Sequence, residues 1–165
     1  MKSFLTLTMF VIAIIASANE VAVNFIKLNE GFRPTVYYSA GKPHIGYGFT
    51  DPVYIRMQRM DEAKATTILR GYVERCKASV RKLVRVDLTE NQEAVLIDFI
   101  YQFGTGAFLN STLLKKINMK QYSQVPNELR RWVKQKEVRN GNVVYVTVPG
   151  LVNRANRRIQ LWNKR

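Results

Sequence analysis

The sequence has very little cysteine and histidine, and each shortage excludes a class of site. Cys76 is the single cysteine of the 165 residues, so no disulfide can form within the chain. His44 is the single histidine, and one histidine with one cysteine cannot supply a zinc site of the Cys/His type. We therefore expect no metal site, and an ordinary half-buried core position for Cys76.

Acidic residues are also scarce. The chain has 12 Asp and Glu against 26 Lys and Arg, which gives a formal net charge of +14. A positive field of this size attracts polyanions, whether nucleic acid, an anionic membrane or an acid-bearing bacterial wall. Charge alone does not distinguish among these partners.

Residues 1–18 have the layout of a secretory signal. Lys2 precedes the apolar run Phe4–Ile15, and Ala16-Ser17-Ala18 follows as a small-residue cleavage site. The segment is short for a helix that spans a bilayer. The sequence therefore predicts a cleavable signal peptide and a mature chain that begins at Asn19.

The chain beyond residue 18 has mostly helical spacing of its apolar residues. This spacing predicts helices over residues 20–29, 61–82, 89–104, 107–118, 121–136 and 150–163. We expect Val23, Ile26 and Leu28 to face a core from the first helix. On the second helix, Lys77 is expected on the exposed face.

Local signals fix some of the boundaries. Thr89 and Gln92 form a capping-box pattern ahead of the third helix, which should be central and buried and should end at Gly104. The turn sequence Asn140-Gly141 precedes the β-prone run Val143–Val148, so a short hairpin is expected there.

The most unusual stretch runs from Leu28 to Thr50. Glu30 lies at the end of the first predicted helix, and Gly31 can take the left-handed conformation that ends a helix. The residues that follow suggest short strands around a glycine turn, a small sheet that could form one wall of a cleft. Glu30 would then lie near the mouth of that cleft.

This stretch resembles the phage-type lysozymes, family 24 of the glycoside hydrolases. The resemblance continues in family order over nearly all of residues 19–165. It is carried by Glu30-Gly31, Tyr37, Gly41, Ile45-Gly46-Tyr47-Gly48, Leu88–Ala94, Tyr101–Gly104, Ala107–Leu114, Trp132, and Asn153-Arg154-Ala155 with Arg157. Any one of these motifs is weak, whereas the ordered set is specific.

The resemblance implies an α+β fold, mostly α, of the two-lobed lysozyme type. A small N-terminal β-sheet would be joined by the long helix over 61–82 to a helical C-terminal lobe, with the cleft between the lobes. Residues 1–18 would be the signal peptide and residues 19–165 the catalytic domain. Some similar enzymes keep such a first segment as a releasable membrane anchor, which is the alternative for residues 1–18 and would give transient membrane contact.

The implied activity is that of an endolysin, a muramidase. It would cleave the β-1,4 bond between N-acetylmuramic acid and N-acetylglucosamine of peptidoglycan and so lyse the bacterial host. The predicted signal peptide indicates export to the periplasm or cell wall of the host and, with the absence of a recognised nucleic-acid motif, argues against a nucleic-acid partner. We expect a monomer, and the resemblance implies no cofactor. The positive charge would then serve adhesion to the anionic wall.

The resemblance also carries over site residues. Glu30 matches the general acid, and Arg154 matches the arginine beside that acid. Substrate contact is expected from Thr50, Tyr101, Gln102 and Ser111.

The second catalytic group departs from the family pattern. Where the family has Asp or Cys, this sequence has Ser39 when counted from Glu30, and Tyr38 when counted back from Gly46. The family threonine before Ile-Gly-Tyr-Gly is replaced by His44. We assign His44 as the candidate general base, since imidazole changes protonation close to neutral pH. Ser39 is expected to position water or a sugar hydroxyl.

Other solutions stay open at this point. Asp51 could fold back as the missing carboxylate, although its place after Thr50 suits a helix cap. Glu30 could act alone, or the site could have lost hydrolysis and kept peptidoglycan binding. In a different class of function, the basic C-terminal third could bind nucleic acid. It contains Arg130, Arg131, Lys134, Lys136, Arg139, Arg154, Arg157, Arg158, Lys164 and Arg165.

Overall fold

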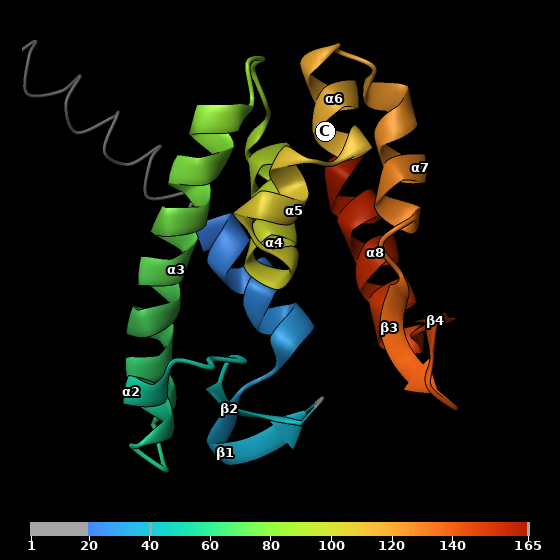
Figure 1. Ribbon diagram of the computed structural model, residues 1–165. Coiled ribbons are helices and arrows are strands. Elements are labelled where there is room, and N and C mark those ends of the chain that lie inside the picture. The colour runs from blue at the N-terminus through green and yellow to red at the C-terminus, as the bar shows by residue number, and fades with distance from the viewer. Residues whose placement is uncertain (1–19, 40, 165) are drawn as a thin grey trace, which may run out of the picture. The chain divides into compact units, whose positions relative to one another are not determined.

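A computed structural model describes residues 20–39 and 41–164 (Figure 1). The predicted signal peptide, residues 1–18, lies outside the described residues. The chain divides after Ala78 into two compact units. Each unit is described in turn.

The first unit begins with a helix over residues 20–30, as predicted. The helix ends because Gly31 adopts φ +68°, and its N–H donates to Lys27 O at 3.0 Å. Val23 and Ile26 are buried, as expected, but the prediction for Leu28 was wrong because this side chain is 66% exposed. With about 3.6 residues per turn, Leu28 is rotated to the side of the helix opposite Ile26.

The predicted small sheet is confirmed as an antiparallel hairpin. It is formed by β1 (Arg33–Ser39) and β2 (Lys42–Gly46). After β2, Ile45 and Phe49 exchange two backbone hydrogen bonds of 3.0 and 2.9 Å and close a tight loop. The ring of Phe49 is buried and stacks on Tyr72 with centroids 5.4 Å apart, so the loop is anchored in the core of this unit.

Two helices complete the first unit. The short α2 (Pro52–Ile55) follows the loop, and the long α3 (Glu62–Leu83) matches the predicted helix over 61–82. The chain passes from the first unit to the second within α3. Cys76 is buried, but the prediction for Lys77 was wrong because it is buried too. Lys77 comes four residues after Val73 and so lies on the apolar stripe of α3.

The second unit is mostly helical, with one hairpin. Its elements are α4 (Glu90–Phe103), α5 (Thr105–Leu109), α6 (Thr112–Asn118), the 3₁₀ turn η1 (Tyr122–Gln124), α7 (Val125–Arg130), β3 (Lys134–Arg139), β4 (Asn142–Thr147) and α8 (Pro149–Trp162). The capping box of Thr89 and Gln92 is present, and α4 is the buried central helix of this unit. Helices α7 and α8 pack beside each other (Figure 1).

Two helix predictions in this unit need correction. The single helix expected over 107–118 is divided into α5 and α6 at Asn110 and Ser111, because Ser111 caps a new helix. The helix expected over 121–136 ends at Arg130, and β3 begins at Lys134. The hairpin predicted around Asn140-Gly141 is confirmed and is longer than expected, since β3 pairs with β4 over its whole length.

Across residues 20–39 and 41–164, no helix combines the length and the hydropathy that crossing a bilayer requires.

Candidate active site

Glu30 lies against the backbone of Gly48. It is the last residue of the first helix, and its side chain is half-buried. A methyl group added to Gly48 would lie 3.2 Å from Glu30 Oε2, and Gly48 has φ +84°. Gly48 thus needs glycine both for its left-handed backbone and for the close approach of the Glu30 carboxylate.

His44 contacts the same glycine from β2. Its Nδ1 lies 3.3 Å from the carbonyl oxygen of Gly48. A carbonyl oxygen only accepts hydrogen bonds, so Nδ1 carries the hydrogen of the neutral ring and Nε2 is the basic nitrogen. The geometry therefore provides the tautomer that a general base at Nε2 requires.

Tyr37 holds the His44 ring from the facing strand. The two residues are paired in the β1–β2 register, and their rings stack with centroids 5.4 Å apart and planes 25° apart. The guanidinium of Arg33 lies 4.8 Å from the centroid of the Tyr37 ring. Burial raises the pKa of Tyr37, the negative charge of Glu30 raises it further, and Arg33 partly offsets both. Contacts at Gly48, the ring stack and the charge effect of Glu30 on Tyr37 therefore link Glu30, Tyr37 and His44 within the first unit.

The other candidates of the first unit lie on exposed positions. Ser39 ends β1 opposite Lys42, and Thr50 follows the anchored loop; both are exposed. Asp51 is the N-cap of α2, and its Oδ1 accepts from the Val53 N–H at 2.9 Å. This contact supports the expected capping role of Asp51 over that of a second catalytic carboxylate.

Among the candidate site residues of the second unit, Gln102 and Ser111 make hydrogen bonds within that unit. Tyr101 and Gln102 lie half-buried near the end of α4, and Gln102 Oε1 accepts from Arg158 Nη2 at 2.6 Å. Ser111 is buried, donates to Phe108 O at 2.7 Å and accepts from the Leu114 N–H at 3.1 Å. Ser111 also lines a cavity of about 340 Å³, together with Asn110, Thr112, Arg131 and Trp132. A substrate contact by these residues stays a prediction.

Arg154 is buried and binds Asp98. Its Nη2 lies 2.6 Å from Asp98 Oδ1, and Nε of Arg158 lies 2.6 Å from Asp98 Oδ2. Burial alone would raise the pKa of Asp98, but the guanidiniums of Arg158 and Arg154 hold it below its usual range. The placement of Arg154 beside Glu30 stays a prediction.

Comparisons with known proteins identify the family of this chain. The family model for phage lysozyme matches residues 27–158. The chain belongs to the phage lysozyme family.

Individual relatives agree with this membership. The chain is 34% identical over 139 residues to an endolysin of Bacillus phage B103, covering 82% of this chain and 50% of that protein. It thus spans half the length of that relative. It is 34% identical over 126 residues to a SAR-endolysin of Escherichia phage Mu, covering 76% of this chain and 68% of that protein.

A solved structure gives the fold. The muramidase domain of SpmX from Asticaccaulis excentricus matches with a TM-score of 0.77 and 26% identity, covering 87% of this chain and 95% of that domain. The predicted α+β, mostly helical, lysozyme-like fold is confirmed. The chain has a small sheet in its first unit and a mostly helical second unit, and α3 continues from the first unit into the second.

Two structural roles were not predicted from the sequence. Tyr37 was noted as a family residue but not as a neighbour of His44, although a tight turn at Gly41 implies that they face each other. Asp98 was not singled out, although an aspartate within the apolar run of α4 requires buried cationic partners.

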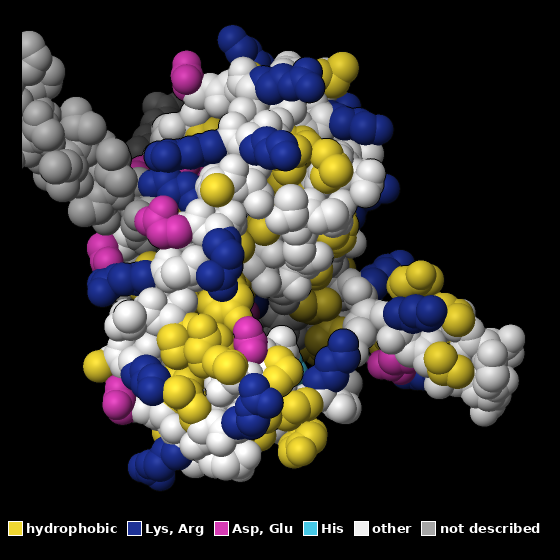
Figure 2. All heavy atoms as spheres, turned by 60° about the vertical axis from the view of Figure 1, so that its left-hand side comes forward, with side chains coloured by type: hydrophobic (Ala, Val, Ile, Leu, Met, Phe, Trp, Pro, Cys, Tyr) yellow, Lys and Arg dark blue, Asp and Glu magenta, His cyan; other side chains and the backbone are white. Residues whose placement is uncertain are grey.

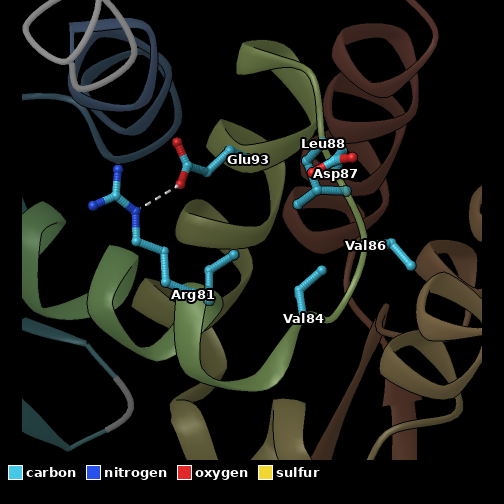
Figure 3. A pocket seen from close by; sticks show the side chains of 7 residues that line it. Arg81, Val84, Val86, Asp87, Leu88 and Glu93 are labelled. Carbon is cyan, nitrogen blue, oxygen red and sulfur yellow. Dashed lines mark ion pairs between the residues drawn. The ribbon is translucent and has the colours of Figure 1, made fainter. Parts of the chain in front are cut away.

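A further cavity of about 250 Å³ lies in the second unit (Figure 3). It is lined by Val80, Arg81, Val84, Val86, Asp87, Leu88 and Glu93. Arg81 Nε and Glu93 Oε1 lie 3.7 Å apart across it. None of the predicted site residues lines this cavity.

The grouping of metal-ligating side chains and the distribution of charged side chains are properties of the whole described part of the chain. In the part of the chain that the structure describes, no group of three or more His, Cys, Asp or Glu side chains is arranged to hold a metal ion. Figure 2 shows Lys and Arg side chains spread over the visible face, and Asp and Glu side chains are fewer there.

Proposed function

We propose that this chain is an endolysin, a muramidase that hydrolyses the β-1,4 bond between N-acetylmuramic acid and N-acetylglucosamine of bacterial peptidoglycan. Membership of the phage lysozyme family and relatives named as endolysins support the substrate and the bond. The observation that carries the mechanism is the shared contact at Gly48, which Glu30 approaches with its carboxylate and His44 with Nδ1.

Glu30 acts as the general acid. It transfers its proton to the glycosidic oxygen while the bond from this oxygen to the anomeric carbon breaks. His44 acts as the general base. Its Nε2 takes a proton from a water molecule as the oxygen of that water bonds to the anomeric carbon on the opposite face of the sugar. The product then has the inverted configuration, and solvent returns the proton from His44 to Glu30.

Tyr37 and Gly48 are the positioning residues of this mechanism. The stacked phenol ring fixes the plane of the imidazole, and the Gly48 carbonyl fixes its tautomer. Ser39 and Thr50 are exposed in the same unit and can offer hydroxyl groups to water or to the glycan. Tyr101, Gln102, Ser111 and Arg154 complete the proposed set from the second unit.

Export and wall adhesion belong to the same proposal. Residues 1–18 would carry the chain across the inner membrane, either as a cleaved signal or as a releasable anchor that contacts the membrane transiently. The similarity to a SAR-endolysin supports delivery to the periplasm. The excess of Lys and Arg supports adhesion to the anionic wall. The enzyme would act there as a monomer, without cofactor or nucleic acid.

The test is muramidase activity of residues 19–165 on purified sacculi. Wild type is compared with Glu30→Gln and His44→Ala, and product anomers are read by NMR. We expect both variants to be inactive and the wild-type product to be inverted. Asp51→Asn is the matched control, because it removes a nearby carboxylate that caps α2, and it should keep activity.

Other outcomes would redirect the assignment. Activity that survives His44→Ala excludes His44 as the base and leaves Glu30 alone, or Asp51 if the control loses activity. An inactive wild type that still binds sacculi would indicate a wall-binding protein of lysozyme fold. Salt-sensitive binding to DNA that exceeds binding to sacculi would favour the nucleic-acid alternative.

A further inference from the structure

The β3–β4 hairpin presents one exposed face with an unusual composition. The strands pair antiparallel, with Lys134 opposite Thr147, Lys136 opposite Tyr145 and Val138 opposite Val143. Side chains alternate along a strand and paired residues point to the same side, so these six residues form one face, here called the hairpin face. All six are exposed.

The opposite side of the hairpin differs. On that side Glu137, Val144 and Val146 are half-buried, whereas Gln135, Arg139 and Asn142 are exposed. The two strands contact mainly each other, and the hairpin extends from the end of the second unit where α8 begins (Figure 1). The hairpin face is thus exposed at all six of its positions, whereas the opposite side is exposed at three of six.

The hairpin face joins apolar side chains to cations. Val138, Val143 and Tyr145 are 69%, 52% and 66% exposed. Lys134 and Lys136 lie beside them, and the six residues include no carboxylate. Exposed apolar side chains that gather in this way generally mark an interaction surface.

We infer that the hairpin face docks on the surface of an anionic phospholipid membrane. Lying flat, the face would place two valines and the Tyr145 ring in the boundary between headgroups and acyl chains, where a tyrosine can keep its hydroxyl in water. The lysines would extend their apolar stems along the same boundary and set their ammonium groups on lipid phosphates.

The composition of the face favours lipid over a glycan strand. A sugar site surrounds an aromatic ring with neutral groups that hydrogen-bond to hydroxyls. Tyr145 lies between Val143 and Thr147 along β4 and opposite Lys136, so Thr147 is the one neutral polar side chain of the face besides Tyr145 itself. Charge complementarity and apolar exposure therefore both point to an anionic bilayer.

The inference does not depend on the Glu30 and His44 assignment. Vesicle binding is measured without hydrolysis, so an inactive enzyme would leave it intact. Residues 1–18 are present in every protein compared, so any membrane contact of that segment is common to all of them.

The experiment measures partition of the full chain onto vesicles of equimolar phosphatidylglycerol and phosphatidylcholine, and onto phosphatidylcholine alone. Lys134→Gln with Lys136→Gln should lower partition onto the anionic vesicles by about 25-fold, at about fivefold per lysine. The matched control, Lys82→Gln with Lys115→Gln, removes two exposed lysines from α3 and α6 and should have a clearly smaller effect.

The apolar part is tested with isosteric changes. Val138→Thr with Val143→Thr keeps the branched shape that suits a strand, but puts hydroxyl groups where methyl groups would enter the lipid. This pair should also weaken partition, whereas Val53→Thr, at a valine of α2 with similar exposure, should not. In Tyr145→Trp, the added indole fluorescence should shift to shorter wavelength with anionic vesicles.

Three results would overturn the inference. The first is partition that is unchanged in both hairpin variants. The second is a loss of binding to sacculi without a loss of binding to vesicles, which would assign the face to the wall polymer. The third combines two observations. The indole fluorescence of Tyr145→Trp does not shift with anionic vesicles, and the wild type dimerises through the hairpin. This result would assign the face to a second copy of the chain.

Discussion

Tyr37 and His44 face each other across the β1–β2 hairpin, with ring centroids 5.4 Å apart. The imidazole is therefore held in one plane from β1 while its Nδ1 is held by Gly48. The orientation of the proposed base thus depends on a ring in the facing strand.

Removing that ring should impair catalysis without unfolding the protein. Tyr37→Ala leaves His44 free to rotate, and we expect kcat on sacculi to fall by about 10- to 100-fold, as for other small misplacements of catalytic groups. Tyr37→Phe keeps the stacked ring and should retain most of the activity. Equal activity of all three proteins would show that the stack does not orient the base.

Gly48 and Gly41 provide a pair of matched substitutions. Both have positive φ, at +84° and +73°, so alanine should cost about 1–2 kcal/mol of folding free energy at either position. A Cβ at Gly48 would press on Oε2 of Glu30, whereas a Cβ at Gly41 would meet open space. Gly48→Ala should lose activity and Gly41→Ala should keep it.

The measurements are urea unfolding and kcat on the same samples. Similar losses of unfolding free energy with different activities would tie Gly48 to the position of the acid. Similar activities in the two variants would show that the Glu30 carboxylate tolerates displacement.

Local signals explain why much of this first unit could be predicted. Gly31 and Gly41 imply a helix end and a turn through their own backbone preferences, and both predictions were confirmed. The prediction for Leu28 was wrong although its spacing was informative, because a residue two positions after the buried Ile26 is rotated to the opposite side of a helix. The prediction for Lys77 was also wrong. Its charge suggested an exposed position, whereas its spacing placed it on the apolar stripe of α3.

The second unit was harder to predict because its elements depend on each other. Trp132 and Val133 continue the helical spacing of Leu129, yet the next residues, Lys134–Arg139, pair with Asn142–Thr147 as a strand. Ser111 matched a family position proposed to touch substrate, and only the structure shows its hydroxyl capping α6. The two partners of Asp98 are more than fifty residues away in sequence, so no local pattern could name them.

Asp98 should be essential for stability. Asp98→Asn removes the carboxylate that neutralises the buried guanidiniums of Arg154 and Arg158. Loss of one partner from a buried ion pair typically costs about 3–5 kcal/mol, and we expect a loss of this order in urea unfolding. Glu137→Gln, which breaks an exposed pair with Arg139, is the control and should change stability by less than about 1 kcal/mol.

The same residue predicts a pH dependence. Because the pKa of Asp98 is lower in the folded protein than in the unfolded chain, its contribution is fully present above the unfolded value. That contribution is lost as the pH falls below about 4 and through the folded value. Unfolding free energies measured between neutral pH and acid should show a shallower decline in Asp98→Asn, and an unchanged slope would contradict the assignment.

Tyr47 should control the titration of Glu62. The Tyr47 hydroxyl donates to Glu62 Oε1 at 2.7 Å, and this hydrogen bond is the main cause that lowers the pKa of Glu62; desolvation opposes it, and Lys27 adds a smaller lowering effect. Tyr47→Phe should therefore raise the pKa of Glu62, as followed by carboxyl NMR. Tyr38→Phe alters an exposed tyrosine and should leave that titration unchanged.

The pairing of Asp98 with two arginines of α8 also bears on the order in which the second unit folds. Until α8 has packed, α4 carries a carboxylate on its apolar face that only water can satisfy. Burying α4 earlier would leave that charge without a cationic partner, so we expect stable packing of the second unit to require Pro149–Trp162. A chain that is cut short before α8 should therefore leave α4 exposed to chaperones and proteases.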